Sequence, residues 1–244
     1  MKLKSGYKFN NSLFIMPMII FYIVVFFFEG ILIFITAGLN SDGSMSGMEF
    51  ASWIFIFVMG LIMFKMSFHF LSANSVSRKT MLLSSLLSGL TMAGILFVMD
   101  TINVIMLKSL TIFSEKYVTV FEMVFSKKIA GINILKYILF SLISYLLFFI
   151  LGYLIEAINY RLPQKIKIAI IIGLIAFFSV GLPYLTKYIN KADITFLNAL
   201  SNFIKTNILG SANGFIITQL VLTAIIALIS YRVAIRANLI SKQG

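Results

Sequence analysis

Long apolar runs separated by short polar segments dominate the 244-residue chain. A helix needs about 20 predominantly apolar residues to cross a bilayer, because each residue advances it by about 1.5 Å and the hydrocarbon core is about 30 Å thick. By this measure the runs predict six membrane-spanning helices in a single domain that fills residues 1–244. Their expected ranges are 13–38, 48–71, 81–107, 134–155, 166–187 and 214–236. The expected fold class is all-α and integral to a membrane.

The composition excludes a soluble globular domain. Hydrophobic residues make up 60% of the chain and charged residues 11%, and the mean hydropathy is +1.03. The interior of a soluble domain is too small to hide that much apolar surface. We therefore expect membrane lipid to surround most of the chain.

The basic residues predict the orientation in the membrane. Lysine and arginine are enriched in cytoplasmic loops, and an even number of spans puts both termini on one side. With both termini in the cytoplasm, that side holds twelve of the 20 basic residues. These are Lys2, Lys4, Lys8, Lys65, Arg78, Lys79, Arg161, Lys165, Lys167, Arg232, Arg236 and Lys242. The other eight basic residues, all lysines, are expected on the outer side, where the acidic residues that offset them are Asp42, Glu49, Glu115, Glu122 and Asp193. We expect a multi-pass protein of a cytoplasmic membrane, with both termini in the cytoplasm, whose net charge of +12 faces anionic lipid and not nucleic acid.

Two segments on the expected outer side show helical periodicity. Residues 112–125 and 193–209 each place apolar side chains on one face. The opposite, polar face of the first segment consists of Glu115, Thr119 and Glu122. Both segments are expected to form amphipathic helices that lie on the outer surface or re-enter the membrane. The Gly- and Ser-rich residues 39–47, by contrast, predict a plain external turn.

Small and polar residues line one edge of the third span. Ser85, Gly89 and Ala93 recur every four residues, which permits close approach of another helix. The same edge continues to Asp100 and Asn103. These two side chains are therefore expected on a packing face.

The first span has a similar edge, with Tyr22, Glu29 and Thr36 at seven-residue intervals. The sixth span also has such an edge, and Gln219 is the first polar residue of that edge. A charge that faces lipid near mid-membrane costs at least about 2.5–3.5 kcal/mol, so Glu29 and Asp100 should face protein or water. The candidate translocation-pathway residues are Tyr22, Glu29, Asp100, Asn103 and Gln219. An equally consistent interpretation is that the two acids are neutral and hydrogen-bonded between helices.

The sequence contains no pattern typical of catalysis. His69 is the single histidine and there is no cysteine. The chain therefore cannot supply the two or more imidazole or thiolate ligands that a typical zinc site needs. The motifs H-E-x-x-H, G-x-S-x-G and G-x-x-x-x-G-K-[ST] do not occur either. We expect no catalytic residue, metal site or cofactor site, so energy for any transport would come from another protein.

A short basic segment, SANSVSRKTMLLS (residues 72–84), separates the second and third spans. It is polar enough to leave the bilayer, and Asn74, Ser75 and Ser77 are candidate helix caps. We expect it to form a short helix across the cytoplasmic exit. The stretch NSVSRKTMLLSSLLSG resembles the vSRKtffl turn of type-2 ATP-binding-cassette (ABC) exporter permeases. The six spans, the basic start MKLKSGYKF and the outer helices are also similar to that family.

This resemblance implies a non-catalytic subunit of an ATP-driven exporter. In the family the turn is a coupling helix that docks on a separate ATPase, which binds ATP and Mg. Carried over, the docking surface consists of Ser75, Ser77, Arg78, Lys79 and Thr80. The alternative for Arg78 and Lys79 is that they anchor the loop to anionic lipid.

The resemblance also implies partners and cargo. The family uses twelve spans around one pathway, which implies a homodimer, or a pair with a related permease, together with ATPase subunits. Small bacterial members export membrane-active peptides such as lantibiotics and phenol-soluble modulins, so the implied substrate is an amphipathic peptide. Two alternatives stay open: the substrate-binding component of an energy-coupling vitamin importer, and an ATPase-independent immunity protein. The first span is bulky throughout, unlike the small-residue first span of such vitamin-binding components.

Overall fold

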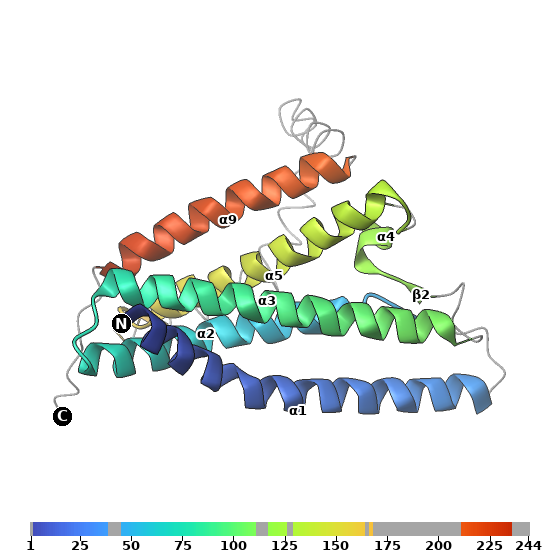
Figure 1. Cartoon of the computed structure of the whole chain (residues 1–244), viewed down its shortest axis with the longest axis horizontal. Helices are drawn as coiled ribbons and strands as arrows, with labels where there is room; N and C mark the ends of the chain where they lie inside the picture. Colours follow the sequence, from blue (N-terminus) through green and yellow to red (C-terminus); the bar gives the residue numbers. More distant parts are fainter. Residues whose placement is uncertain are drawn as a thin grey trace.

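The computed structural model describes residues 2–38, 45–110, 117–125, 129–163, 166–167 and 211–235, and this part of the chain is nearly all helical (Figure 1). Five of its helices are long and apolar enough to cross a membrane, as in a multi-pass membrane protein. They are α1 (Lys2–Gly38), α2 (Glu49–Ala73), α3 (Arg78–Ser109), α5 (Ile132–Asn159) and α9 (Ala212–Ile235). The short elements are α4 (Val120–Phe125), β1 (Met45–Ser46) and β2 (Tyr117–Val118).

Four predicted spans agree with α2, α3, α5 and α9 to within four residues at each end. The first predicted span lies within α1, and the helix extends beyond it toward the N-terminus, starting at Lys2 and not at residue 13. The prediction began after the basic residues, but long lysine side chains can reach water from the end of a membrane helix. The predicted span 166–187, apart from its first two residues, and the outer helix 193–209 lie outside the described residues.

The predicted helix over residues 112–125 is wrong at Tyr117 and Val118, which form β2 and pair in parallel with β1. β1 lies in the segment that was predicted to be a plain turn. Helix α4 starts only after Thr119, because Thr119 and Glu122 form a reciprocal cap. The Thr119 N–H donates to the Glu122 carboxylate at 3.0 Å, and the Glu122 N–H donates to the Thr119 hydroxyl at 3.2 Å.

The separate short helix predicted between the second and third spans is also wrong. Helix α2 ends at Ala73, residues 74–77 form a turn, and α3 begins at Arg78. Ser77 caps α3 by accepting the Thr80 N–H at 3.3 Å. Because the cap directly precedes residues that all tolerate a helix, Arg78 and Lys79 form the first turn of α3 itself.

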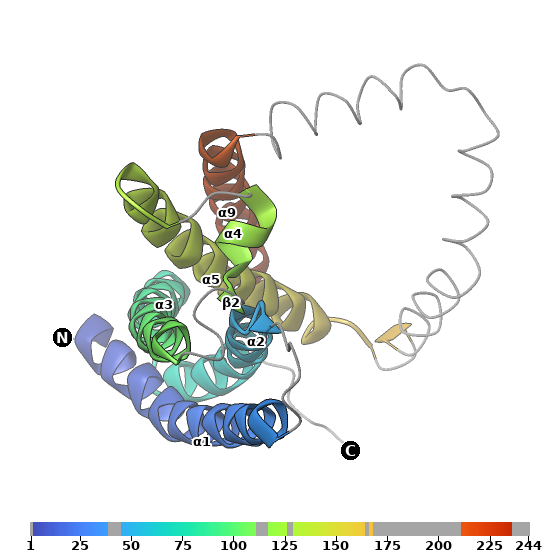
Figure 2. The ribbon, with the colours of Figure 1, turned by 90° about the vertical axis from the view of Figure 1, so that its right-hand side faces the viewer.

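The turn and the short strands lie at opposite ends of the bundle (Figure 1). We call the end with residues 74–77 the turn end, and the end with β1 and β2 the strand end. Helix α5 packs between α9 and α2, and α1 covers α3 on the other side (Figure 2). The buried core between these helices includes Ile56, Met63, Met92, Leu96 and Phe149.

Two glycines bring α2 and α5 into backbone contact. A Cβ atom on Gly60 would lie 2.2 Å from the carbonyl oxygen of Phe149, and one on Gly152 would lie 2.1 Å from the carbonyl oxygen of Phe57. Both distances are far shorter than a non-bonded contact between a carbon and an oxygen atom, which is at least 3.0 Å in practice. Only glycine therefore allows the two helices to approach this closely.

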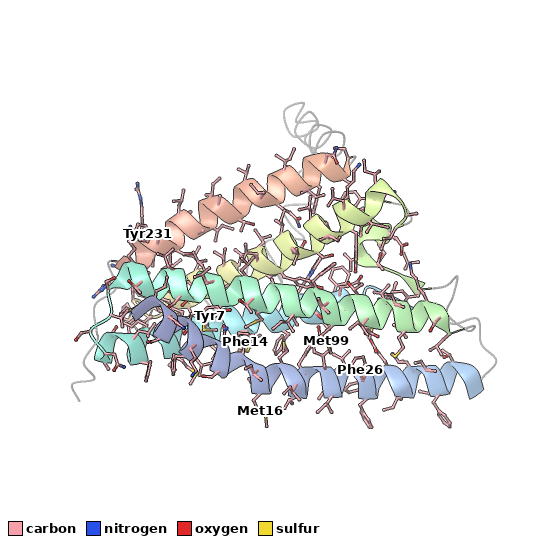
Figure 3. All side chains as sticks on the ribbon, in the orientation of Figure 1. Tyr7, Phe14, Met16, Phe26, Met99 and Tyr231 are labelled. Carbon is pink, nitrogen blue, oxygen red and sulfur yellow. The ribbon has the colours of Figure 1, made fainter. Side chains whose placement is uncertain are left out.

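Helix α1 has one face toward the bundle and one face away from it. Figure 3 shows Phe14 on the inner side and Met16 on the outer side, and their side chains are 1% and 64% exposed. The predicted polar edge of α1 lies on the inner side, since Tyr22 and Glu29 are 4% and 1% exposed. The small edge of α3 is buried as predicted, from Ser85 to Asn103.

Candidate functional site

The Asp100 carboxylate is the meeting point of four helices. Its Oδ1 atom accepts hydrogen bonds from the Tyr22 hydroxyl of α1 at 2.8 Å and the Ser52 hydroxyl of α2 at 2.9 Å. Its Oδ2 atom accepts a hydrogen bond from the Tyr145 hydroxyl of α5. Asp100, on α3, is 6% exposed. Each of the other three helices therefore contributes one hydroxyl donor to a single buried acid.

A second buried acid lies beside this group. The Asn103 side-chain amide, one turn beyond Asp100 on α3, donates to Glu29 Oε1 of α1 at 2.6 Å. Glu29 is 1% exposed. These hydrogen bonds come from neutral groups, so they leave any charge on the carboxylates uncompensated.

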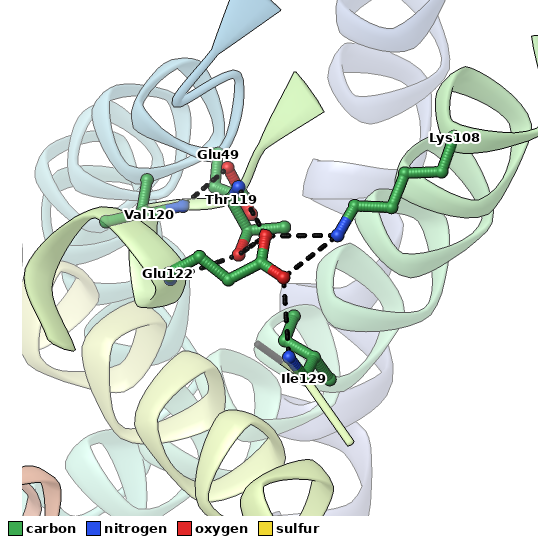
Figure 4. A network of polar contacts seen from close by, with 6 residues as sticks. All are labelled: Glu49, Lys108, Thr119, Val120, Glu122 and Ile129. Atoms are coloured by element: carbon green, nitrogen blue, oxygen red, sulfur yellow. Dashed lines mark hydrogen bonds and ion pairs between the residues drawn. The ribbon is translucent and has the colours of Figure 1, made fainter. Parts of the chain in front are cut away.

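Glu49 is a third buried acid, at the first residue of α2. It is 4% exposed, and its Oε2 atom accepts the Val120 N–H of α4 at 3.4 Å (Figure 4). From the sequence alone we counted Glu49 among the outer charges that offset lysines. The structure instead buries it beneath the start of α4. Together with Ser52, Asp100 and Asn103, it lines a small cavity.

An ion pair holds α4 to the strand end of α3. The Lys108 ammonium lies 3.0 Å from both carboxylate oxygens of Glu122, which also accept the N–H groups of Thr119 and Ile129 at 3.0 and 3.3 Å (Figure 4). Partial burial alone would raise the pKa of Glu122, but the Thr119 N–H and the Lys108 ammonium hold it below its ordinary value. Glu122 is therefore ionised at neutral pH.

The structure brings together four of the five predicted pathway residues. Tyr22 contacts Asp100, and Asn103 contacts Glu29. Gln219 belongs to a different contact, since its amide donates to the Ser144 hydroxyl of α5 at 2.9 Å.

Sequence reasoning missed Glu49, Ser52 and Tyr145. A usable signal was present in α5, because Tyr137, Ser141 and Tyr145 recur every four residues and form a polar edge like that of α3. In α2, Ser52 lies three residues after Glu49, which places both on one helical face.

Another buried polar cluster lies nearer the turn end. The Asn10 amide of α1 donates to the hydroxyls of Ser84 and Ser85 of α3 at 3.4 and 3.3 Å, and the Ser67 hydroxyl of α2 donates to Asn10 Oδ1. Asn10 is fully buried. This neutral cluster fixes the position of α1 against two helices.

The predicted docking residues all lie at the turn end. Ser75, Ser77 and Lys79 are exposed. Arg78 is half-buried, and its guanidinium lies 5.8 Å from the centre of the Phe68 ring. The two basic residues therefore differ in their contacts: Arg78 packs on Phe68 of α2, whereas the Lys79 side chain is exposed.

In the described part of the chain, no three His, Asp or Glu side chains are grouped as ligands for a metal ion. The buried acids are held instead by hydroxyl, amide and backbone donors. Comparisons with known proteins found no match for the chain among family models, curated proteins or solved structures.

Proposed function

We propose that the chain is the membrane-spanning, non-catalytic subunit of an ABC exporter, driven by a separate cytoplasmic ATPase that docks on residues 72–84. The observation that carries this proposal is the continuity of α3. One helix without proline connects Arg78 at the turn end to Asp100 in the buried acidic group. The 22 residue steps from Arg78 to Asp100 correspond to about 33 Å of helix.

A continuous helix is a suitable transmitter of force. In this proposal, closure of the ATPase pair moves the exposed turn, and α3 moves as a rigid element with it. Because Asp100 bonds to α1, α2 and α5, a displacement of α3 strains contacts with all three helices at once. Alternating access then consists of breaking and remaking these contacts as the bundle changes shape.

The proposal includes a second permease copy in the same membrane. The outer face of α1 supports this part, since Phe27, Phe28 and Phe34 are 66%, 59% and 80% exposed. Lipid or another membrane subunit must cover such side chains. A homodimer supplies the twelve spans that the resembling family places around one pathway.

The proposed cargo is an amphipathic peptide taken from the cytoplasm or the inner leaflet. An apolar groove of about 420 Å³ between α3, α5 and α9 supports an apolar cargo. Leu87, Leu90, Ile143 and Leu220 are among the residues that line it. A peptide with one apolar face would bury that face here by the ordinary hydrophobic effect.

The docking claim is tested by purifying the chain from its native cells in mild detergent and identifying what accompanies it by mass spectrometry. We expect an ATPase that carries G-x-x-x-x-G-K-[ST], and we expect its recovery to fall at least fivefold in Lys79→Ala. Arg78→Ala should have a similar effect, because it removes a charge and the contact with Phe68. Exposed Lys4, at the same end of the bundle, provides the matched control Lys4→Ala.

Equal recovery of the ATPase with Lys79→Ala, Arg78→Ala and Lys4→Ala would contradict docking and favour simple anchoring to lipid. A chain that purifies without any ATPase and binds a vitamin tightly would contradict the exporter assignment altogether.

A further inference from the structure

Two of the buried acids, Glu49 and Asp100, line a cavity that the transport proposal does not use. Glu49 and Ser52 of α2, Asp100 and Asn103 of α3, and Tyr117 of β2 line it. The space accommodates about one particle of the size of a water molecule. Its walls thus present carboxylate, amide and hydroxyl oxygens within a very small volume.

Three buried oxygen atoms in the cavity wall or next to it receive no hydrogen bond from the described residues. They are Glu49 Oε1 and Asn103 Oδ1 in the cavity wall, and Glu29 Oε2 beside Asn103. Glu49, Asn103 and Glu29 are 4%, 5% and 1% exposed, so each side chain is more than nine-tenths buried. All three atoms are acceptors, and the group that satisfies them must be a donor or a cation.

The charge balance points the same way. Asp100 is bonded to three hydroxyl groups and Glu29 to an amide, and none of these partners is positively charged. A carboxylate buried in a membrane protein without a counter-charge is costly. Hard cations prefer carboxylate, carbonyl and hydroxyl oxygens as ligands, as found here. A divalent ion fits poorly, because Ca²⁺ takes about six to eight oxygen ligands and Mg²⁺ keeps several bound waters, whereas this cavity accommodates about one water-sized particle.

We propose that this cavity binds Na⁺ through oxygen atoms of Glu49, Ser52, Asp100 and Asn103. The ion joins α2 to α3 and neutralises part of the acidic group, and it stabilises the arrangement in which the four helices meet at Asp100. This inference concerns the isolated chain and does not depend on ATPase docking.

The single tryptophan of the chain provides a local probe. Trp53 is adjacent to Ser52, and its ring lies 5.0 Å from Phe50 and 5.2 Å from Phe148, measured between ring centres. Its fluorescence is therefore expected to respond to a small displacement of the start of α2. The experiment uses the purified full chain in nanodiscs, titrated with NaCl or with choline chloride at equal ionic strength.

We expect a saturable fluorescence change with Na⁺ but not with choline, and a rise in Tm of about 5 °C at roughly a hundredfold excess over Kd. Glu49→Gln and Asp100→Asn should each weaken the apparent Na⁺ affinity at least tenfold. Glu156→Gln is the matched control, because Glu156 lies in the last turn of α5 and does not line the cavity. Its Na⁺ response should be unchanged.

The same response to Na⁺ and choline would overturn the proposal. So would a Na⁺ response that persists unchanged in Glu49→Gln, which would place the ion elsewhere. A response to pH with none to Na⁺ would mean that protons alone neutralise the acids, and it also counts against the site. If Asp100→Asn does not fold, the comparison of wild type with Glu49→Gln still decides.

Discussion

Among the acidic side chains that the structure describes, two contrasting surroundings occur. Asp100 and Glu29 are buried and bonded to neutral hydroxyl and amide donors. Glu122 is paired with the ammonium group of Lys108 at 3.0 Å. The first kind leaves any charge on the carboxylate without a charged partner among these bonds, whereas the second balances the charge within the protein.

The ion pair of Glu122 predicts a specific dependence of stability on pH. The folded-state pKa of Glu122 is lower than its ordinary value of 4.5, so the stabilisation is present above that pH and is lost as the pH falls through the folded-state pKa. Glu122→Gln should lower the free energy of unfolding at pH 7 by about 0.5–1 kcal/mol, because the pair is partly exposed. The difference in Tm between wild type and variant, measured from pH 7 to pH 3, should shrink toward the acidic end.

Glu156→Gln is the control for this prediction, since the Glu156 carboxylate accepts a hydrogen bond from the neutral side-chain amide of Asn159. A difference in Tm between wild type and Glu122→Gln that stays constant down to pH 3 would contradict the prediction.

Residue-scale prediction from the sequence worked where one helix carried the whole signal. Asp100 and Asn103 were expected on a packing face because they continue the edge of Ser85, Gly89 and Ala93, and all five are buried. Glu49 was misplaced because its burial depends on α4 and β2, whose positions no periodicity reveals. Contacts between segments far apart in the chain set the surroundings of a residue, and a single sequence does not encode them visibly.

At the scale of elements, the close contact of α2 and α5 is the most demanding feature of the bundle. Gly60→Ala or Gly152→Ala would put a methyl carbon within 2.2 Å of a backbone carbonyl oxygen on the other helix. The helices would have to separate, and we expect a loss of about 1–3 kcal/mol or more in the free energy of unfolding. Denaturation in mild detergent, followed by circular dichroism, measures this loss.

Gly94→Ala is the matched control within α3, because a Cβ atom there would meet nothing within 4 Å. Alanine should be neutral at this position, or stabilising by up to about 1 kcal/mol, through its higher helix propensity. Equal effects of Gly60→Ala and Gly94→Ala would mean that α2 and α5 do not approach as closely as described.

The elements that were predicted incorrectly share one physical cause. The apolar and polar pattern of residues 112–125 fits a helix, but the local cap at Thr119 and Glu122 starts the helix late, and pairing with β1 keeps Tyr117 and Val118 extended. Likewise, the cap at Ser77 starts α3 directly after the turn. Periodicity identifies which face is apolar, whereas side-chain caps determine where a helix begins.

At the scale of the whole molecule, the sequence predicted the membrane-protein class and five of the spans, because length and apolarity alone determine them. The fifth predicted span, residues 166–187, lies outside the described residues apart from its first two positions and stays a prediction. The side of the membrane that each end faces is likewise a prediction, since it depends on the distribution of lysine and arginine and not on packing.

The exporter proposal requires that the turn before α3 faces the cytoplasm, where an ATPase can reach it. The chain contains no cysteine, so Lys79→Cys and Met123→Cys each introduce a single thiol, the first at the turn end and the second at the strand end, at an exposed position. Labelling uses a membrane-impermeant maleimide on intact cells and on inside-out vesicles. We predict that Cys at position 79 is labelled only in inside-out vesicles and Cys at position 123 only in intact cells. Labelling of position 79 in intact cells would contradict the account.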